Sequence, residues 1–292
     1  MDYVNCELCP RKCYVNRTAG KVGYCGCPGT AMVAKTMIHK WEEPALAGNG
    51  GSGAIFFGGC TLGCKYCQNR DISRQAVGKS VDSVELRVMM EELIAKGAEN
   101  IDLVTPTQYL PTILPALEEK LTVPVVYNCG GYERVETLKL LEGKVDIYLP
   151  DLKYADNRLA KALSGAPDYF RVATEAIREM VRQTGPVVLE DGLLKRGVVI
   201  RHLILPGQVG QAKAVIDWVA REFEPGTVLF SLMSQYTPWG DLSSHPELNR
   251  RLRSGEVRTA QTYMENLGLD GFTQDSASAQ EKYTPPFDLT GL

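Results

Sequence analysis

Three cysteines at a C-x3-C-x2-C spacing constrain this chain more than any other feature. Cys60, Cys64 and Cys67 directly follow the apolar run Ala54–Phe57. Three thiolates can hold three irons of a four-iron cubane and leave the fourth iron without a protein ligand. Such an open iron can bind and reduce a small molecule, whereas a cluster closed by four cysteines mainly carries electrons. A structural zinc site is the alternative, but it usually takes four protein ligands and this loop offers three.

Length and charge exclude several classes of protein. The 292 residues suit one large domain, or one domain with a small appendage. The formal net charge is −3 and no long Lys/Arg run is present, so the electrostatic footprint of a nucleic-acid binder is missing. No apolar stretch is long enough to span a bilayer, and Met1–Cys6 does not resemble a signal peptide. We therefore expect a cytoplasmic protein that binds neither nucleic acid nor membrane.

The nine cysteines are unevenly distributed. Without an export signal, crowded cysteines indicate metal or cluster ligation in a reducing, anaerobic or microaerobic cytoplasm rather than disulfides. Cys129 stands alone and is expected to be a buried, inert thiol. Besides the 60–67 loop, one short segment holds the remaining five, Cys6, Cys9, Cys13, Cys25 and Cys27.

This N-terminal cysteine set predicts a second metal centre. A segment this short cannot bury much apolar surface, so a bound metal would supply its folding energy. Four or five thiolates can close a tetrahedral zinc site or hold a second iron–sulfur cluster. The spacing fits both, and it leaves open whether Cys25 or Cys27 is the fourth ligand.

The pattern along the chain predicts an α/β fold. A Cys-rich segment over residues 1–47 ends at the glycine-rich stretch Gly48–Gly53, a main unit follows over 48–275, and a polar, Pro-rich tail occupies 276–292. The main unit alternates apolar strand runs with helical patterns, which indicates a parallel sheet with right-handed crossovers. Six strands favour an incomplete (βα) barrel or a doubly wound sheet, and Leu189–Gly197 reads as a small hairpin. The predicted strands are Ala54–Phe57, Ile101–Thr105, Val123–Asn128, Val145–Leu149, Val198–Leu205 and Val228–Leu232.

Helical patterns lie between these strands. Val84, Val88 and Leu93 mark one apolar face of a helix that ends at Gly97. A second pattern, over Val135, Leu138 and Leu141, ends at Gly143, and a third contains Val215, Ile216, Val219 and Phe223.

The stretch Phe57–Asp71 resembles the cluster loop of radical S-adenosylmethionine (SAM) enzymes, and most of all that of the pyruvate formate-lyase activating enzyme family. The resemblance covers roughly residues 50–275. It implies a partial (βα)6 TIM-type barrel in which Cys60, Cys64 and Cys67 hold a [4Fe–4S] cluster that binds SAM. It also implies reductive cleavage of SAM to a 5′-deoxyadenosyl radical, which takes a hydrogen atom from a substrate.

The same resemblance suggests partners. The substrate is either a glycine in a partner glycyl-radical enzyme or another peptide or small molecule, and the electron comes from a flavodoxin- or ferredoxin-type reductant. The N-terminal cysteines, together with Lys40–Pro44 and Ser234–Tyr236, resemble one branch of activating-enzyme homologues without indicating a substrate. The alternative of another class is a non-catalytic iron–sulfur or zinc protein that carries electrons or joins an assembly.

The resemblance also implies a SAM pocket at the ends of successive strands. Tyr66 would pack near the adenine, while the Thr105–Pro111 loop lacks the family's Glu and would use hydroxyl and carbonyl oxygens instead. For several positions a plain structural role is the alternative: a Pro-braced turn, an Asp–Lys ion pair, or a hydrogen-bonded core histidine. The implied pocket residues are Tyr66, Asn69, Thr105, Thr107, Asn128, Asp151, Lys153 and His202.

Overall fold

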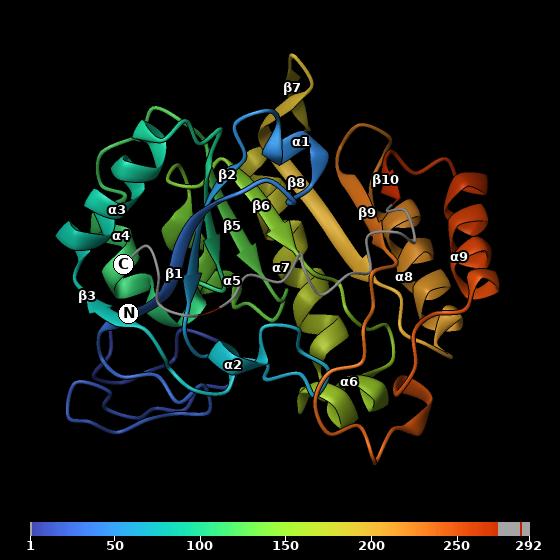
Figure 1. Cartoon of the computed structure of the whole chain (residues 1–292), viewed down its shortest axis with the longest axis horizontal. Helices are drawn as coiled ribbons and strands as arrows, with labels where there is room; N and C mark the ends of the chain where they lie inside the picture. Colours follow the sequence, from blue (N-terminus) through green and yellow to red (C-terminus); the bar gives the residue numbers. More distant parts are fainter. Residues whose placement is uncertain (1, 274–286, 288–292) are drawn as a thin grey trace.

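The fold is a curved ten-stranded sheet with helices packed on its outer face (Figure 1). The computed structural model describes residues 2–273 and Phe287. The strands are β1 (Ala31–His39), β2 (Ser52–Phe57), β3 (Lys79–Val81), β4 (Ile101–Val104), β5 (Val125–Cys129), β6 (Ile147–Pro150), β7 (Val188–Glu190), β8 (Leu193–Leu203), β9 (Leu229–Met233) and β10 (Gly271–Thr273).

Helices connect most of these strands. The α-helices are α1 (Pro44–Ala47), α2 (Arg70–Ser73), α3 (Ser83–Ala95), α4 (Leu110–Ala116), α5 (Val135–Leu138), α6 (Asn157–Ser164), α7 (Tyr169–Thr184), α8 (Val209–Glu222) and α9 (Ser254–Asn266). Three short 3-10 turns are η1 (Thr107–Tyr109), η2 (Lys139–Leu141) and η3 (Pro246–Leu248).

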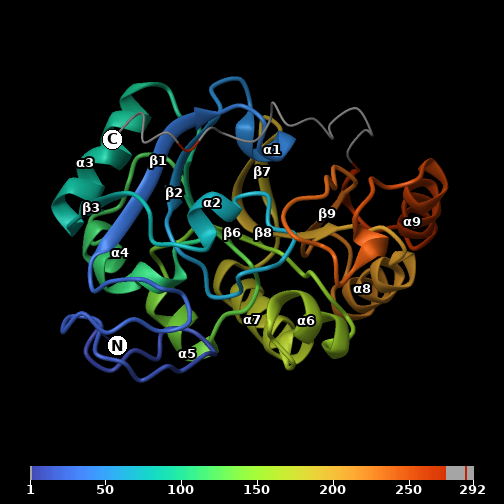
Figure 2. The ribbon, with the colours of Figure 1, turned by 60° about the horizontal axis from the view of Figure 1, so that its bottom comes forward.

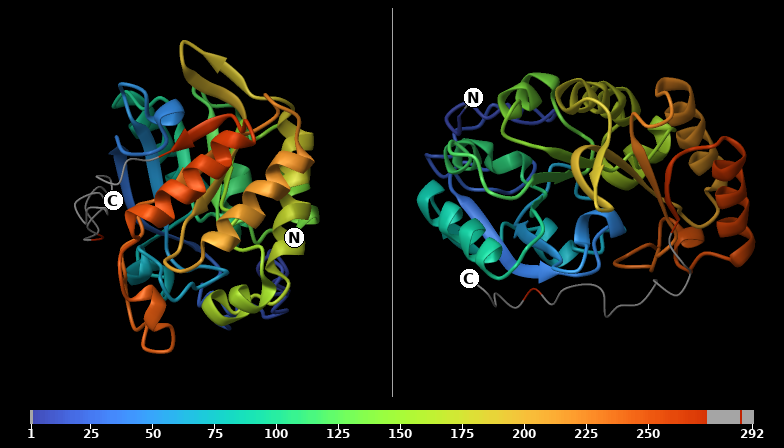
Figure 3. Two further views of the ribbon diagram at one scale, coloured as in Figure 1. Left: turned by 90° about the vertical axis from the view of Figure 1, so that its right-hand side faces the viewer. Right: turned by 90° about the horizontal axis from the view of Figure 1, so that it is seen from above.

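The central part of the sheet is a parallel, partial barrel. Strands β2, β4, β5, β6, β8, β9 and β10 follow one another as parallel neighbours. All six strands expected from the sequence are present, and the predicted mixed α/β barrel is confirmed. Seen along the strands in the right panel of Figure 3, the sheet curves around an interior with helices outside it. The carboxyl ends of these strands, where ligands bind in such folds, therefore lie at one end of the barrel.

Two antiparallel strands extend the sheet beyond β2. Strand β1 pairs with β2 from Val33 opposite Phe57 to His39 opposite Ser52, and β3 pairs with the start of β1. Strand β1 lies inside the range 1–47 that was predicted to be a Cys-rich segment. Its residues belong to the sheet, so the part of that segment without helix or strand is residues 2–30 and the short turn 40–43.

The predicted hairpin is present, but one predicted helix face is wrong. Strands β7 and β8 pair antiparallel around Asp191 and Gly192, which both have positive φ, as a two-residue type I′ turn requires. Helix α3 forms where expected, capped by Asp82. However, Val84 and Val88 are 70% and 48% exposed, and the buried face consists of Leu86, Met89, Met90 and Leu93.

The sheet buries apolar side chains on both faces. The larger cluster lies under the outer helices, and a smaller one fills the barrel interior with Ala45, Leu46, Val126, Ile147, Leu149, Leu194, Val199 and Leu229. Because Ala45 and Leu46 belong to α1, this short helix closes the amino-terminal end of the barrel. The tail 276–292 lies outside the described residues, except that the Phe287 ring packs 5.6 Å from that of Phe56.

Candidate functional site

The three cysteines of the 60–67 loop lie at the carboxyl end of β2. Gly59 turns the chain out of the strand with φ +77°, a conformation that favours glycine. All three thiols are free, with Cys64 buried and Cys60 and Cys67 partly buried. Within residues 2–273, no three Cys, His, Asp or Glu side chains converge at metal-ligand spacing. These side chains therefore do not form a site for a single metal ion, whereas in a four-iron cluster each cysteine binds a different iron and the thiols need not meet at one point.

The chemistry of the loop nevertheless fits an iron–sulfur cluster. Burial raises the pKa of Cys60 to about 12 and also raises the pKa of Cys67, so these thiols need a nearby cation to ionise. The thiol contacts are weak and replaceable: Ser164 Oγ donates to Cys64 Sγ at 2.9 Å, and the Leu62 N–H donates to Cys60 Sγ at 3.4 Å. Three unpaired thiols on one short loop are a donor set that iron accepts.

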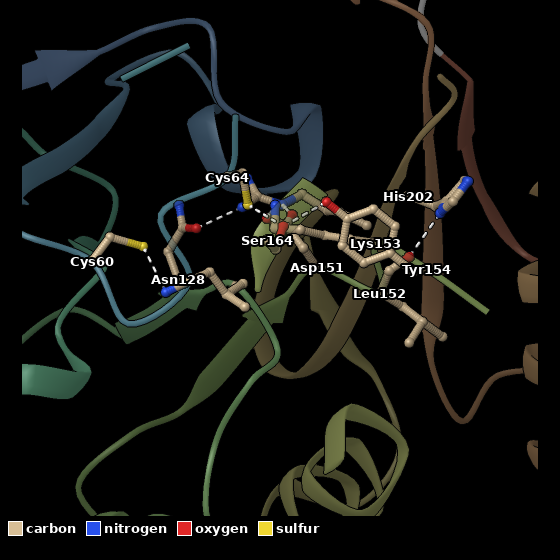
Figure 4. A network of polar contacts seen from close by, with 12 residues as sticks. Cys60, Cys64, Asn128, Asp151, Leu152, Lys153, Tyr154, Ser164 and His202 are labelled. Atoms are coloured by element: carbon tan, nitrogen blue, oxygen red, sulfur yellow. Dashed lines mark hydrogen bonds and ion pairs between the residues drawn. The ribbon is translucent and has the colours of Figure 1, made fainter. Parts of the chain in front are cut away.

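A group of charged side chains lies inside the barrel next to this loop (Figure 4). Lys153 Nζ and Arg201 Nε contact the two carboxylate oxygens of Asp151 at 2.5 and 3.0 Å. Arg201 Nη2 also donates to Asn128 Oδ1 at 2.6 Å. The structure thus brings together three predicted pocket residues, Asn128, Asp151 and Lys153, through an arginine that was not predicted.

Opposite charges keep this group ionised despite burial. Burial alone would raise the pKa of Asp151, but Arg201 and Lys153 outweigh it and hold the pKa below its usual value. Burial would likewise lower the pKa of Lys153, and the charges of Asp151, Cys64 and Tyr66 raise it instead. The nearness of Cys64 and Tyr66 to Lys153 joins the charged group to the cysteine loop.

Aromatic rings complete the neighbourhood of the loop. Tyr66 is 7% exposed, and its ring lies 6.5 Å from that of Tyr154 and 6.1 Å from that of Tyr236. The Tyr154 hydroxyl is 2.6 Å from Ser164 Oγ, the group that contacts Cys64. Tyr66 thus belongs to a cluster of three aromatic side chains. Such a cluster is suited to packing beside a planar heteroaromatic ring.

Two predicted pocket residues point elsewhere. Thr107 Oγ1 donates to Glu133 Oε1 at 2.7 Å on the helix-covered face of the sheet. His202 Nδ1 donates to the Leu152 carbonyl at 2.7 Å, and burial lowers its pKa to about 4, so the ring is neutral. Since side chains alternate along β8, Arg201 faces the barrel interior while His202 faces outward with Ile200. Figure 4 shows His202 and Cys60 at opposite sides of the view.

The remaining two predicted residues border the loop. Thr105 has φ +60°, which is rare for a β-branched residue and is held by hydrogen bonds from Gln108 Nε2 and to the Asn128 carbonyl, both 2.8 Å. Asn69 precedes α2, and its carbonyl accepts the Ser73 N–H at 2.9 Å.

The N-terminal segment packs against the cysteine loop, as Figure 2 shows for the two neighbouring traces. Arg11 Nε donates to the Thr61 carbonyl at 2.9 Å, and its two terminal nitrogens donate to the carbonyls of Ser164 and Gly165 at 2.9 and 2.5 Å. The Tyr24 hydroxyl donates to the Leu62 carbonyl at 3.1 Å. These side chains therefore hold the loop by its backbone.

A second connection runs through Arg17. This arginine is 2% exposed and donates to the carbonyls of Cys27 and Gln108 at 3.1 and 2.7 Å. Gln108 Nε2 in turn donates to the carbonyls of Gly58 and Gly59 at 3.2 Å. A Cβ atom on Gly59 would overlap Cys27 Sγ, so the two cysteine regions touch directly.

The N-terminal thiols gather around Arg17 and Cys25. Burial raises the pKa of Cys9, and the charges of Cys25, Glu133 and Cys13 raise it further. Hydrogen bonding to Cys27 and the charge of Arg17 lower the pKa of Cys25 to about 6. Cys6 Sγ lies 3.8 Å from Arg17 Nη1. Cys27 differs, because it is fully buried against Gly59 with its Sγ 3.7 Å from the Gly58 carbonyl.

Sequence reasoning missed several residues that organise the site. Arg201 lies beside the predicted His202, and only the strand register shows which of the two faces inward. Asp102 is a charged residue inside an otherwise apolar strand, which is a signal the sequence does contain. Arg11, Arg17 and Gln108 act through backbone carbonyls, and such contacts leave no recognisable motif.

Comparison with known proteins agrees with this geometry. A sequence model of the radical SAM superfamily matches residues 54–219, which is more than half of the chain. An uncharacterized protein of Methanocaldococcus jannaschii is 30% identical over 278 residues, covering 92% of this chain and 76% of that protein.

Solved structures share the fold at low sequence identity. Streptococcus suis SuiB bound to S-adenosylmethionine has a TM-score of 0.52 and 14% identity over 74% of this chain, and the chain spans about half of SuiB, 48%. A spore photoproduct lyase variant has a TM-score of 0.52 and 12% identity, covering 83% of this chain and 79% of that one. Among the described residues, no helix is long and apolar enough to cross a membrane.

Proposed function

Because the chain belongs to the radical SAM superfamily, we propose that it is an enzyme that uses Cys60, Cys64 and Cys67 to hold a [4Fe–4S] cluster. When bound, the cluster and SAM supply a one-electron reduction and the fragment that removes a hydrogen atom from the substrate. One observation supports this proposal most directly. The 60–67 loop, with its three free thiols, lies next to Asp151, Lys153 and Tyr66 at the carboxyl end of the barrel.

The chain's own residues then bind and orient. We propose that Tyr66 packs beside the adenine, and that Asn69, Thr105, Asn128, Asp151 and Lys153 provide the polar edge of the SAM pocket. His202 holds the Leu152 carbonyl next to Lys153, and Thr107 holds the buried Glu133. These two act as positioning residues, since neither side chain points toward the cysteine loop.

The first candidate substrate is a peptide segment, with a glycine of a glycyl-radical enzyme as the specific case. The Phe57–Asp71 stretch supports it through its resemblance to activating enzymes. A structure of SuiB bound to its precursor peptide SuiA, with a TM-score of 0.52, supports a peptide as substrate of a protein with this fold. A small molecule is the second candidate, because charged groups line the barrel interior where a polar compound would be recognised.

We further propose that Cys6, Cys9, Cys13 and Cys25 bind a second iron–sulfur cluster or a zinc ion. The gathering of Cys9, Cys13 and Cys25 supports this set. Cys27 is left to contact Gly59, so we assign it to the junction with the catalytic loop. The nine free cysteines support a reducing cytoplasm, in which a flavodoxin- or ferredoxin-type protein would supply the electron.

The test is anaerobic reconstitution followed by addition of SAM and dithionite. The wild-type protein should release 5′-deoxyadenosine, and Cys64→Ala should lose more than the ~10–100-fold that an outer-sphere change typically costs. Cys129→Ala is the matched control, because Cys129 is a buried thiol on the outer face of β5 and is not part of the 60–67 loop. A full cluster without any cleavage of SAM would favour the electron-carrier alternative instead.

A further inference from the structure

Four carboxyl groups surround a single guanidinium inside the barrel. Arg201 contacts Asp151 and Glu42, with its Nη1 3.3 Å from Glu42 Oε1. Glu43 and Asp102 are also close enough to raise the pKa of Arg201, although its burial opposes this. The four acids come from three separate places in the chain: the segment before α1, strand β4 and the end of β6. The proximity of these four acids could not be predicted from the sequence around any one of them.

Three oxygen atoms in this interior lack a hydrogen-bond donor among the described residues. They are Glu43 Oε2, Asp102 Oδ1 and Asn100 Oδ1, on side chains that are 3%, 0% and 2% exposed. The other oxygen of each carboxyl is satisfied: Ser231 donates to Glu43 Oε1 at 2.7 Å, and Asn128 donates to Asp102 Oδ2 at 3.2 Å. A buried acceptor without a donor is expensive, so the missing partner must bring N–H or O–H groups.

The charges are also incomplete. Lys153 and Arg201 form ion pairs with Asp151 and Glu42, so Glu43 and Asp102 share only the more distant charge of Arg201. Burial, with the charge of Glu42, raises the pKa of Glu43 to about 7 and raises that of Asp102 well above its usual value. Both carboxyls are therefore protonated more readily than exposed acids, and a bound cation would favour their ionised forms.

We propose that Glu43 and Asp102 form a binding site for a cationic nitrogen group of the substrate, an ammonium or a guanidinium, inside the barrel. The inference rests on the proposed function in that the ligand is the substrate of the radical reaction. An organic cation fits better than a metal ion, because no three acidic side chains among residues 2–273 lie at metal-ligand spacing from a common point. A guanidinium or ammonium instead donates several hydrogen bonds to separated acceptors. The substrate class is thus a peptide with Lys or Arg, or a small amine.

The test measures binding of small cations to the reconstituted protein without SAM. Methylguanidinium and n-butylammonium are titrated calorimetrically at pH 8, beside methylurea and n-butanol as neutral counterparts of similar shape. We expect the cations alone to bind, and Glu43→Gln and Asp102→Asn each to weaken binding by about tenfold, since each removes a charged acceptor. The exposed Glu190→Gln is the matched control.

The pH dependence adds a second readout. A cation binds the ionised carboxyls, so its affinity should be higher at pH 8 than at pH 6, with protons released on binding. The heat should accordingly differ between buffers of different ionisation enthalpy. Glu42, Asp151, Arg201 and Lys153 also face the site, but opposite charges hold the last three ionised over this range.

Three results would overturn the site: equal binding of cations and neutral compounds, equal binding of K⁺, or a crystal structure that places only water at Glu43 Oε2 and Asp102 Oδ1. If a variant fails to fold, the wild-type comparison of cations with neutral counterparts still decides. Because SAM is absent from the titration, failure of SAM cleavage refutes only the proposed function. Cleavage of SAM without cation binding refutes only this site.

Discussion

The two cysteine-rich regions are built in opposite ways. The 60–67 loop connects β2 to α2, so a strand of the sheet holds one of its ends and a short helix holds the other. Residues 2–30 contain no helix or strand, and side chains such as Arg11, Arg17 and Tyr24 tie them to the carbonyls of neighbouring loops. The first region can thus keep its shape without a metal, whereas the second has little backbone structure of its own. Cysteine ligands can thus lie on a structure that forms without metal, or in a segment whose folding we expect to depend on the metal.

Removing cysteines from the N-terminal set is the strongest test of this difference between the two regions. In Cys9→Ala/Cys13→Ala we expect the N-terminal metal to be lost together with its binding free energy, on the order of 10 kcal/mol for a structural zinc site. Residues 2–30 should then become sensitive to protease while the barrel stays resistant. Metal analysis and limited proteolysis check this, with Cys129→Ala as control. Full protection of the segment in the double variant would mean that it folds without metal.

A second test removes an anchor and leaves the ligands intact. Arg11→Met deletes three hydrogen bonds to carbonyls, each worth roughly 1.5–3 kcal/mol for a charged donor, and we expect a net loss of about 3 kcal/mol because some carbonyls regain water. Denaturant unfolding measures the loss, and hydrogen exchange should show reduced protection of residues 60–67. Arg158→Met is the control, since that side chain is 96% exposed. Unchanged protection of the loop would show that Arg11 does not hold it.

A third test separates the two regions where they touch. Gly59→Ala places a Cβ onto Cys27 Sγ at a residue with positive φ, so we expect destabilisation of about 2 kcal/mol. Gly20→Ala is the matched control: its φ is +75° but nothing lies within 4 Å of the added Cβ, so it should lose only about 1 kcal/mol. Equal losses in the two variants would mean that the contact at Cys27 contributes nothing.

The smallest expected effect concerns a buried acid beside the N-terminal set. Burial raises the pKa of Glu133 to about 8, well above its value of 4.5 in an unfolded chain. The folded protein then binds more protons than the unfolded one between these values, so stability falls as the pH rises and levels off above pH 8. We expect the wild type to lose about 1 kcal/mol between pH 7 and pH 8, and Glu133→Gln to lose less. Parallel urea titrations compare them, and identical slopes would contradict the assignment.

The strands of the barrel were predictable because their signal is local. Runs such as Val145–Leu149 carry β-branched residues without alternation, as strands buried on both faces do. The Asp191–Gly192 turn likewise carries its own sequence preference. Strand β1 was not predicted from the sequence. It is stabilised by its pairing with β2, which is distant information, and it follows a Cys-rich stretch that suggested irregular structure.

The details of the site were less predictable because they depend on register and on distant partners. The sequence placed Arg201 and His202 in one strand, but a shift of one residue decides which of them faces inward. The Thr107 hydroxyl was expected near SAM, yet Glu133, which is distant in sequence, takes it. The exposed Val84 and Val88 show that apolar spacing alone does not identify the packed side of a helix.

The anchoring of the 60–67 loop has a consequence for its tolerance of substitution. Arg11, Tyr24 and Gln108 all donate to main-chain carbonyls, at Thr61, Leu62, Gly58 and Gly59. Every amino acid offers the same carbonyl, so replacing the Thr61 side chain does not remove its bond to Arg11. The anchoring side chains cannot change as freely, because each one serves a fixed geometry. The Thr61 side chain can therefore change without loss of this bond, whereas Gly59 is fixed by its positive φ and by Cys27, and Arg11 is fixed by its three acceptors.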